Sequence, residues 1–399
     1  MDSSLDLSAP AYVDPGTVTR GAHTARRGFA ARFGHQADLV GRAPGRVNLI
    51  GEHTDYNHGL CLPVALPHST YAAVGRRSDN LVRVGSEIAD APWVTTLDQL
   101  GPEQTKGWWS YVSGVLWAMR QDDIEINGVD IFVHSTVPLG AGLSSSAALE
   151  CAVAIAMWSI AGLDANGVDR ARLVELCIRA ETDVAGAPTG GMDQSAALLS
   201  EAGKALLIDF NEPSATSVDL HLIEAGLEIL VVDSGVSHAL IDGGYGARRA
   251  DCEAAARTLG VPSLRQVTAA MIEGVEDRRV RRRARHVVTE IERVRRTVDA
   301  IETSDFAAIG EYFAASHASL RDDFEVSCPE LDLIVETLTS SGAIGARMTG
   351  GGFGGSAVSL IASEHIDKAA EDVRRAFVDQ DWKTPQFLKV APSAPAELA

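Results

Sequence analysis

The sequence predicts a two-domain protein that mixes helices and strands. Its 399 residues are 46% hydrophobic and 22% charged, which is typical of a globular chain long enough for about two domains. Strand-like runs, as at residues 129–134, alternate with long apolar helical segments, as at residues 147–161. After residue 210 one clean strand at residues 227–233 is followed mainly by long helices. We therefore expect a domain boundary near residues 215–225.

The elements are expected in a definite order along the chain. Residues 1–20 should be poorly ordered, residues 21–220 should form an N-terminal domain, and residues 221–399 a C-terminal domain. A two-residue apolar period predicts strands at residues 47–50, 60–66, 71–75, 81–85, 129–134, 205–210, 227–233 and 356–362. Helical periodicity predicts helices at residues 24–33, 147–161, 168–185, 245–259, 279–301, 306–320 and 331–341, and helix starts at residues 108 and 193.

Charge and cysteine content limit the classes of partner. The formal net charge of −19 argues against nucleic acid or an anionic membrane surface. The arginine-rich segment 277–296 is a local exception, and its apolar spacing indicates the solvated face of an amphipathic helix rather than a polyanion site. The five cysteines show no metal-ligand spacing, and no apolar run approaches the roughly 18 residues of a membrane span. We expect a cytoplasmic protein.

The most informative stretch is residues 138–150, PLGAGLSSSAALE, between a predicted strand and a predicted helix. Gly140 and Gly142 allow a tight turn and a close approach of the backbone to a ligand. Ser144, Ser145 and Ser146 follow at the helix start, where unpaired N–H groups and the helix dipole favour an anion. The pattern predicts a phosphate site. An ordinary capped helix after a turn is the alternative.

A polar connector lies between two short strand-like runs, residues 47–50 and 60–66. Arg46 comes just before the first run, and the connector holds Glu52, His53, Asp55, Tyr56 and Asn57 within six positions. Such groups hydrogen-bond hydroxyls in fixed directions. The connector therefore favours sugar recognition over a plain surface hairpin.

Two further segments leave their roles open. Trp108, Trp109 and Trp117 lie in a predicted helix, where tryptophans most often belong to the core, although one could stack on a flat base. Gly190 and Gly191 precede a helix start at which Asp193 falls. Asp193 is therefore either an N-cap or first-turn charge, or a catalytic carboxylate.

The last motif is glycine-rich and satisfies the pattern GxGxxG at Gly350, Gly352 and Gly355. A dinucleotide site requires a helix after this pattern, whereas residues 356–362 alternate as a strand. We expect instead a glycine hairpin that approaches another loop or a ligand. The P-loop pattern GxxxxGK[ST] is absent from the sequence.

Together these motifs resemble those of the GHMP kinase superfamily and, within it, of the galactokinase family. Residues 45–57, GRVNLIGEHTDYN, are similar to the galactokinase signature, while residues 138–148 and 348–355 are similar to motifs of the whole superfamily. The resemblance covers essentially the whole chain, in the family's order and spacing. It implies an α+β GHMP kinase fold, with a ribosomal protein S5 domain 2-like N-terminal domain, a ferredoxin-like C-terminal domain and the active site in the cleft between them.

The resemblance also implies an activity: transfer of a phosphoryl group from ATP, with Mg²⁺, to the anomeric hydroxyl of α-D-galactose, in a monomer or weak dimer. The products would be α-D-galactose 1-phosphate and ADP. The catalytic pair would be Asp193, as the base, and Arg46. The sugar-binding set would be Arg46, Glu52, His53, Asp55, Gly190, Asp193 and Tyr245. The nucleotide-binding set would be Trp108, Tyr111, Gly140, Gly142, Leu143, Ser144, Ser145 and Ser146. The Mg²⁺ ligands would be Ser146 and Glu181.

Two other functions stay open at this level. A sugar 1-kinase acting on N-acetylgalactosamine or arabinose would differ in its pocket near the sugar's C2 or C5, which a single sequence does not resolve. A galactose-sensing regulatory protein of the same fold would carry a damaged phosphate loop, whereas residues 140–148 are complete here.

Overall fold

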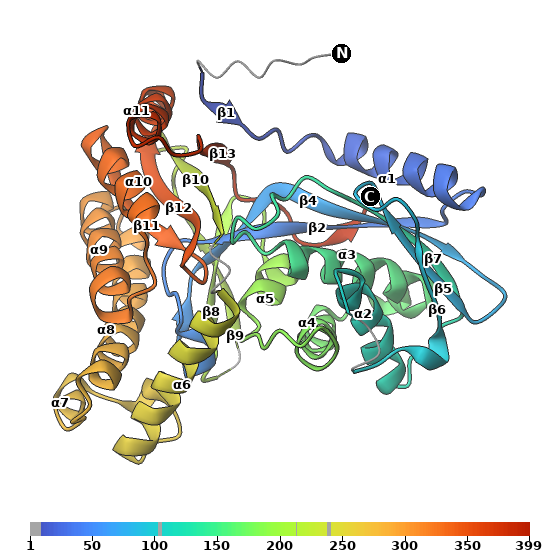
Figure 1. The fold of residues 1–399 in the computed structure, drawn as a ribbon, viewed down its shortest axis with the longest axis horizontal. Coiled ribbons are helices and arrows are strands. Elements are labelled where there is room, and N and C mark those ends of the chain that lie inside the picture. Colours follow the sequence, from blue (N-terminus) through green and yellow to red (C-terminus); the bar gives the residue numbers. More distant parts are fainter. Residues whose placement is uncertain (1–8, 103–105, 213, 238–240) are drawn as a thin grey trace.

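The first half of the chain, together with one strand from the C-terminal end, forms a six-stranded sheet that positions the phosphate loop. The computed structural model describes residues 9–102, 106–212, 214–237 and 241–399. The strand order is β14–β2–β4–β7–β5–β6. Its strands are β2 (Leu39–Asn48), β4 (Pro63–Arg76), β5 (Leu81–Ser86), β6 (Trp93–Thr96), β7 (Val129–Ser135) and β14 (Glu397–Leu398). In Figure 1 the helix α1 (Val18–Phe33) covers one face of this sheet, and α2 to α5 lie on the other side.

Helix α3 (Ser145–Ile160) packs directly on β2 and β4. It is rich in alanine and buried along most of its length, so its backbone can approach the sheet closely. At Gly41 a Cβ would lie 2.0 Å from the carbonyl oxygen of Ala152, which leaves no room for a side chain. This close packing fixes the start of α3, and with it the phosphate loop that leads from β7. The strand and helix predicted at residues 129–134 and 147–161 are confirmed.

Three helices pack around α3, namely α2 (Trp109–Gln121), α4 (Arg170–Arg179) and α5 (Met192–Leu199). Directly after α4 comes a π-helical turn, Ala180–Ala185, so the single helix predicted at residues 168–185 consists of two parts. Such turns widen a helix locally and are frequent at functional sites.

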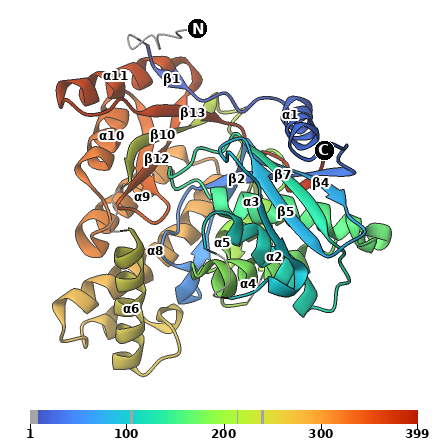
Figure 2. The ribbon, with the colours of Figure 1, turned by 45° about the vertical axis from the view of Figure 1, so that its right-hand side comes forward.

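The second half of the chain, together with β1 from the N-terminal end, forms a five-stranded sheet in the order β1–β13–β10–β12–β11. Its strands are β1 (Ala11–Tyr12), β10 (Leu227–Ser237), β11 (Ala343–Thr349), β12 (Gly354–Ala362) and β13 (Gln386–Val390). The accompanying helices are α6 (Ile241–Leu259), α7 (Ala269–Ile272), α8 (Arg278–Glu302), α9 (Phe306–Ser319), α10 (Pro329–Ser340) and α11 (Ile366–Asp379). A small sheet of β3 (Leu60–Cys61), β8 (Lys204–Asp209) and β9 (Ser214–Asp219) completes the fold. Figure 2 shows α6 beside α8, at the end of the molecule far from the six-stranded sheet.

The two ends of the chain cross between the halves. Strand β1 pairs with β13 of the second sheet, and β14 pairs with β2 of the first. Residues 1–8 lie outside the described residues, but residues 11–12 are tied down by this pairing and Thr17 caps α1. The poor order expected for residues 1–20 is therefore wrong for the part that is described, because sheet pairing outweighs the polar composition. The division at residue 220 stays a prediction.

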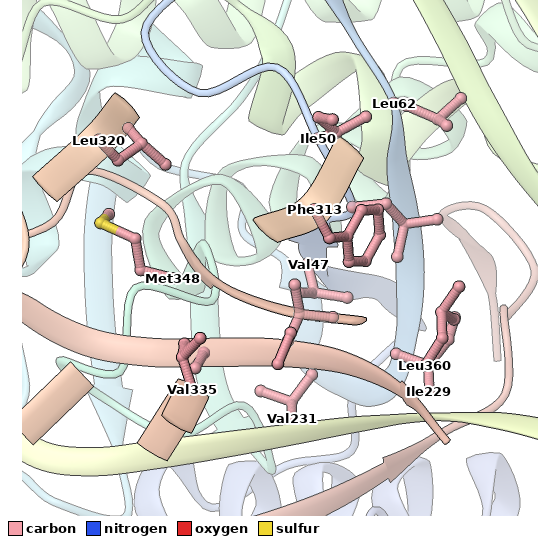
Figure 3. Packing of buried hydrophobic residues seen from close by; sticks show 14 of the residues in the cluster. Val47, Ile50, Leu62, Ile229, Val231, Phe313, Leu320, Val335, Met348 and Leu360 are labelled. Atoms are coloured by element: carbon pink, nitrogen blue, oxygen red, sulfur yellow. The ribbon is translucent and has the colours of Figure 1, made fainter. Parts of the chain in front are cut away.

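A continuous apolar core joins the two halves behind the polar connector. Val47 and Ile50 beside the connector pack into one cluster with Ile229, Phe313 and Leu360 of the second half (Figure 3). Each of these five residues is at most 3% exposed, and full burial of such a side chain contributes about 1.5–3 kcal/mol. This core thus fixes the position of the polar connector relative to the second half of the chain. Among the described residues, no helix combines the length and apolarity needed to cross a membrane.

Candidate active site

The phosphate loop is a tight left-handed turn that exposes the start of α3. Gly140, Gly142 and Ser144 have φ values of +77°, +71° and +59°. A residue with a side chain, such as Ser144, rarely adopts this backbone conformation. The Ser144 side chain makes no capping hydrogen bond to α3, because its Oγ donates to Oδ2 of Asp193 at 2.5 Å. The first N–H groups of α3 are therefore free of a side-chain cap, which supports the predicted anion site over an ordinary capped helix.

The glycine hairpin between β11 and β12 packs against this loop. A Cβ on Gly350 would lie 3.1 Å from the carbonyl oxygen of Gly142, and one on Gly355 would lie 3.2 Å from that of Ala141. The Oγ of Ser356 donates to the same Ala141 carbonyl at 2.7 Å. The predicted hairpin is confirmed, and since a strand follows it, the dinucleotide pattern lacks its helix.

Asp193 lies at the junction of these parts. It occupies the first turn of α5, with Gly191 at the N-cap, so the N-cap alternative is wrong. Its Oδ1 accepts a hydrogen bond from Nε of Arg46 at 2.9 Å, and its Oδ2 accepts the bond from Ser144. Arg46 also donates to the carbonyl oxygen of Gly142 at 2.7 Å. The carboxylate is therefore held in one orientation, while its side chain is still 23% exposed.

Within the polar connector, His53 is a buried wall of the site. Its Nε2 lies 3.2 Å from the carbonyl oxygen of Gly351 and its Nδ1 lies 3.0 Å from the hydroxyl of Tyr56, so Nε2 donates and Nδ1 accepts. Burial lowers the pKa of His53 to about 3, with a further contribution from His286, and the ring is neutral. Tyr245 packs on the His53 ring at a centroid distance of 5.4 Å.

Asp55 is the partly exposed acid of the polar connector, whereas Glu52 is buried. It begins a 3₁₀ turn, Asp55–Asn57, and lies so close to Gly190 that a Cβ there would be 2.1 Å from its Oδ2. Burial, together with the negative charge of Asp193, raises the pKa of Asp55 to about 6. His53, Asp55, Gly190, Asp193 and Tyr245 thus lie near one another, and their contact with a sugar stays a prediction.

Glu52 is placed differently from the other connector residues. Its side chain is almost completely buried, and its carboxylate pairs with Arg347. Its Oε1 accepts hydrogen bonds from the backbone N–H of Gly350 at 3.0 Å and from Oγ1 of Thr349 at 3.1 Å. The carboxylate therefore ties the connector to the glycine hairpin, and its direct contact with a sugar stays a prediction.

A second carboxylate, Glu181, lies in the π-helical turn next to the phosphate loop. Oγ of Ser146 donates to its Oε1 at 3.0 Å, and Nε2 of Gln194 donates to its Oε2 at 2.5 Å. Burial and the neighbouring charge of Asp193 raise the pKa of Glu181 to about 7. Gln194 also donates to Oε2 of the fully buried Glu150 at 3.0 Å. Sequence analysis missed Gln194 and Glu150, although an acid inside the apolar segment 147–161 was a signal.

A cavity of about 600 Å³ lies between the phosphate loop and the glycine hairpin. All eight predicted nucleotide residues line it, as do Arg46 and Asp193. Trp108 therefore faces the cavity, whereas Trp109 stacks on Trp93 at a centroid distance of 6.1 Å. Ile88 and Leu139 also line the cavity and are 69% and 67% exposed; as isolated apolar residues in loops they give no signal in the sequence.

Family models match three parts of the chain. The galactokinase galactose-binding signature matches residues 27–76, the GHMP kinases N terminal domain matches residues 110–201, and the GHMP kinases C terminal domain matches residues 297–379. These spans contain the polar connector, the phosphate loop with Asp193, and the glycine hairpin.

Relatives and solved structures agree with these matches. A galactokinase of Streptomyces coelicolor is 48% identical, covering 94% of this chain and 98% of that protein. A galactokinase of Mycobacterium tuberculosis is 42% identical, covering 88% and 97%. The structure of Lactococcus lactis galactokinase complexed with galactose matches with a TM-score of 0.88 and 30% identity, covering 94% and 98%. Methanococcus jannaschii mevalonate kinase, with a TM-score of 0.66 and 15% identity over 89% and 98%, shares the fold.

Proposed function

Because the chain belongs to the galactokinase family of the GHMP kinases, we propose that it transfers the γ-phosphoryl group of ATP to the anomeric hydroxyl of α-D-galactose. The observation that carries this proposal is the Asp193 carboxylate, fixed by Arg46 and Ser144 at the junction of the polar connector and the phosphate loop. A sugar at the connector and a nucleotide at the loop would meet there. The close relatives named above support galactose as the acceptor.

The chain's own residues supply positioning and charge for this transfer. Asp193 orients the anomeric hydroxyl and accepts its proton as the new O–P bond forms. Arg46, bonded to Asp193 and to the phosphate loop, places a positive charge beside the oxygens on which negative charge develops. The uncapped N–H groups of α3 hold the phosphates. Phosphoryl transfer depends mainly on such positioning and charge stabilisation.

The residues near the loop also fit a Mg²⁺ ion. Ser146 and Glu181 offer a hydroxyl and a carboxylate in contact with each other, the hard oxygen donors that Mg²⁺ prefers alongside substrate phosphates and water. The raised pKa of Glu181 marks a carboxylate short of positive charge. No group of three acidic, His or Cys side chains forms a protein-only metal site among the described residues. When bound, the ion neutralises charge on the phosphates.

The site favours an enzyme over a non-catalytic protein of the same fold. The intact phosphate loop and the bonded Asp193 favour an enzyme over a galactose-sensing regulatory protein. We further propose an enzyme that works in the cytoplasm, as a monomer or weak dimer, without nucleic acid or membrane partners. The net charge of −19 supports the last point, because it disfavours binding to nucleic acid and to anionic membrane surfaces.

A coupled ADP-release assay with ATP and Mg²⁺ tests the proposal. The acceptor panel contains galactose, glucose, N-acetylgalactosamine, arabinose, mevalonate and homoserine. We expect turnover on galactose and little on glucose, because an inverted hydroxyl leaves a polar group unpaired, which costs about 1–3 kcal/mol. Turnover on another acceptor alone would overturn the substrate, and galactose binding without turnover would favour the regulatory protein.

A further inference from the structure

A second cavity, of about 670 Å³, lies between α8, α9 and the segment 264–269. None of the residues that line it belongs to the active site described above. Leu264, Val267, Ile291 and Tyr312 give it an apolar wall. Its volume lies within the range of about 300–1,000 Å³ that is usual for small-molecule sites.

Four arginines line this cavity: Arg265, Arg293, Arg295 and Arg296. Glu292 and Glu311 line it as well, and Glu292 is bonded to both Arg295 and Arg296. These two outer arginines therefore share one carboxylate, and they lie on the solvated helix face that the sequence predicted.

The two inner arginines have donors to spare. Arg265 donates through Nη2 to Asp209 at 2.6 Å, and Arg293 donates through Nε to Glu290 at 2.7 Å. Arg265 Nη1 and Arg293 Nη2 are buried and have no hydrogen-bond partner. Each guanidinium thus bonds one carboxylate and leaves one nitrogen without a partner, which is costly for a buried donor. The side chains as a whole are 14% and 13% exposed.

We propose that this cavity binds a small phosphate ester, with its phosphate on Arg265 and Arg293 and its apolar body against Leu264 and Tyr312. A phosphate has three terminal oxygens and can accept bonds from two guanidinium groups at once, whereas the two oxygens of a carboxylate match the fork of one. The apolar wall favours an ester with an apolar body over a bare ion.

The site is connected to the polar connector through Glu290. Its Oε2 accepts the bond from Arg293, and its Oε1 accepts one from the backbone N–H of Gly51 at 3.1 Å. Arg347 lies 3.7 Å from the same Oε1 and pairs with Glu52. A phosphate that attracts the Arg293 guanidinium changes the field on Glu290, and thereby the segment that positions His53 and Asp55. Ligand and sugar should therefore alter each other's affinity by the same factor.

Calorimetric titration with phenyl phosphate tests the site, in the presence of a non-hydrolysable ATP analogue that fills the phosphate loop. Arg265→Gln removes a charge but keeps an amide that can donate to Asp209, and Ala315→Trp fills the cavity from α9 without a change of charge. The matched controls are Arg278→Gln at the exposed start of α8 and Ala314→Trp, the neighbouring exposed position, both outside this cavity.

We expect Kd for phenyl phosphate to rise at least about tenfold in both cavity variants and to stay unchanged in both controls. Benzoate, the carboxylate probe, should bind at least about tenfold more weakly than phenyl phosphate. Galactose should change Kd for phenyl phosphate in the wild type but not in Ala315→Trp. The proposal is overturned if the wild type gives no binding once the ATP analogue is present, if the cavity variants bind like the controls, or if benzoate binds equally well.

Discussion

Replacement of Asp55 by Asn should stabilise the folded protein while it weakens sugar binding. The Asp55 carboxyl is partly buried next to Asp193, and its pKa is raised from 3.8 to about 6. At pH 8 the Asp55 carboxyl is ionised in both the folded and the unfolded protein. Because ionisation costs more free energy in the folded protein, the charge on Asp55 lowers the free energy of unfolding. The amide keeps the shape of the side chain and removes the charge, but it loses an acceptor for sugar hydroxyls.

The expected gain in the free energy of unfolding follows from the raised pKa of Asp55. One pKa unit corresponds to about 1.36 kcal/mol, so the rise of the Asp55 pKa from 3.8 to about 6 gives about 3 kcal/mol. We expect about 1–3 kcal/mol, because Asp55 is partly exposed and solvent screens part of the effect. For a chain of 399 residues, an unfolding entropy of about 0.8 kcal/mol/K converts this gain into a rise in Tm of about 1–4 °C. The gain should be complete above pH 6, diminish between pH 6 and 4, and vanish below pH 4, where both states are protonated.

Thermal denaturation at pH 4, 5, 6 and 8 measures this gain, with galactose titrations of the same proteins by calorimetry. Glu276→Gln, which neutralises an exposed acid outside the cavity, serves as the control and should leave Tm nearly unchanged. A gain of the same size at pH 4 and pH 8, or a loss of stability at pH 8, would refute the reasoning, because burial of charge would then not be the cause.

Three further substitutions test the remaining roles. Asp193→Asn should lower kcat at least about 10³-fold with little change in the Kd of an ATP analogue; substantial turnover in the variant would exclude Asp193 as the base. Gly190→Ala places a Cβ 2.1 Å from Oδ2 of Asp55, so KM for galactose should rise about tenfold or more. The control Gly203→Ala has no neighbour within 4 Å of its Cβ but has a φ of +83°, so it should lower Tm through backbone strain and leave KM unchanged. Glu181→Gln should weaken Mn²⁺ binding to the nucleotide complex, measured by electron paramagnetic resonance, about tenfold or more; unchanged Mn²⁺ affinity would contradict its role as a ligand.

The features that sequence analysis predicted well are those that local patterns determine. The strand at residues 129–134, the helix at 147–161 and the glycine turn between them follow from apolar periodicity and from Gly140 and Gly142 alone. The glycine hairpin was predictable because a strand pattern, and no helix, follows Gly355. Asp193 could be placed in a first turn, but not beside Arg46, since 147 positions separate the two residues along the chain.

The features that were missed depend on packing between distant segments. The connector pattern suggests that Glu52 points at a ligand like its neighbours, yet its carboxylate is taken up by Arg347 and the backbone of Gly350. Gln194 adjoins Asp193 in the sequence, but its link between Glu181 and Glu150 appears only when α3, α5 and the π-helical turn meet. The apolar periodicity of a single segment does not predict a contact between these three segments.

Three acidic residues, Asp55, Glu181 and Asp193, lie close together although their charges repel one another. Asp55, Glu181 and Asp193 are close enough for the charge of Asp193 to raise the pKa of the other two, and Arg46 supplies only one bonded positive charge. The free protein therefore holds more negative charge than its own residues neutralise, which destabilises it at neutral pH. A divalent cation at Ser146 and Glu181 and hydroxyl donors at Asp55 would relieve this excess when they bind. Relief of this charge repulsion would then favour the binding of these ligands.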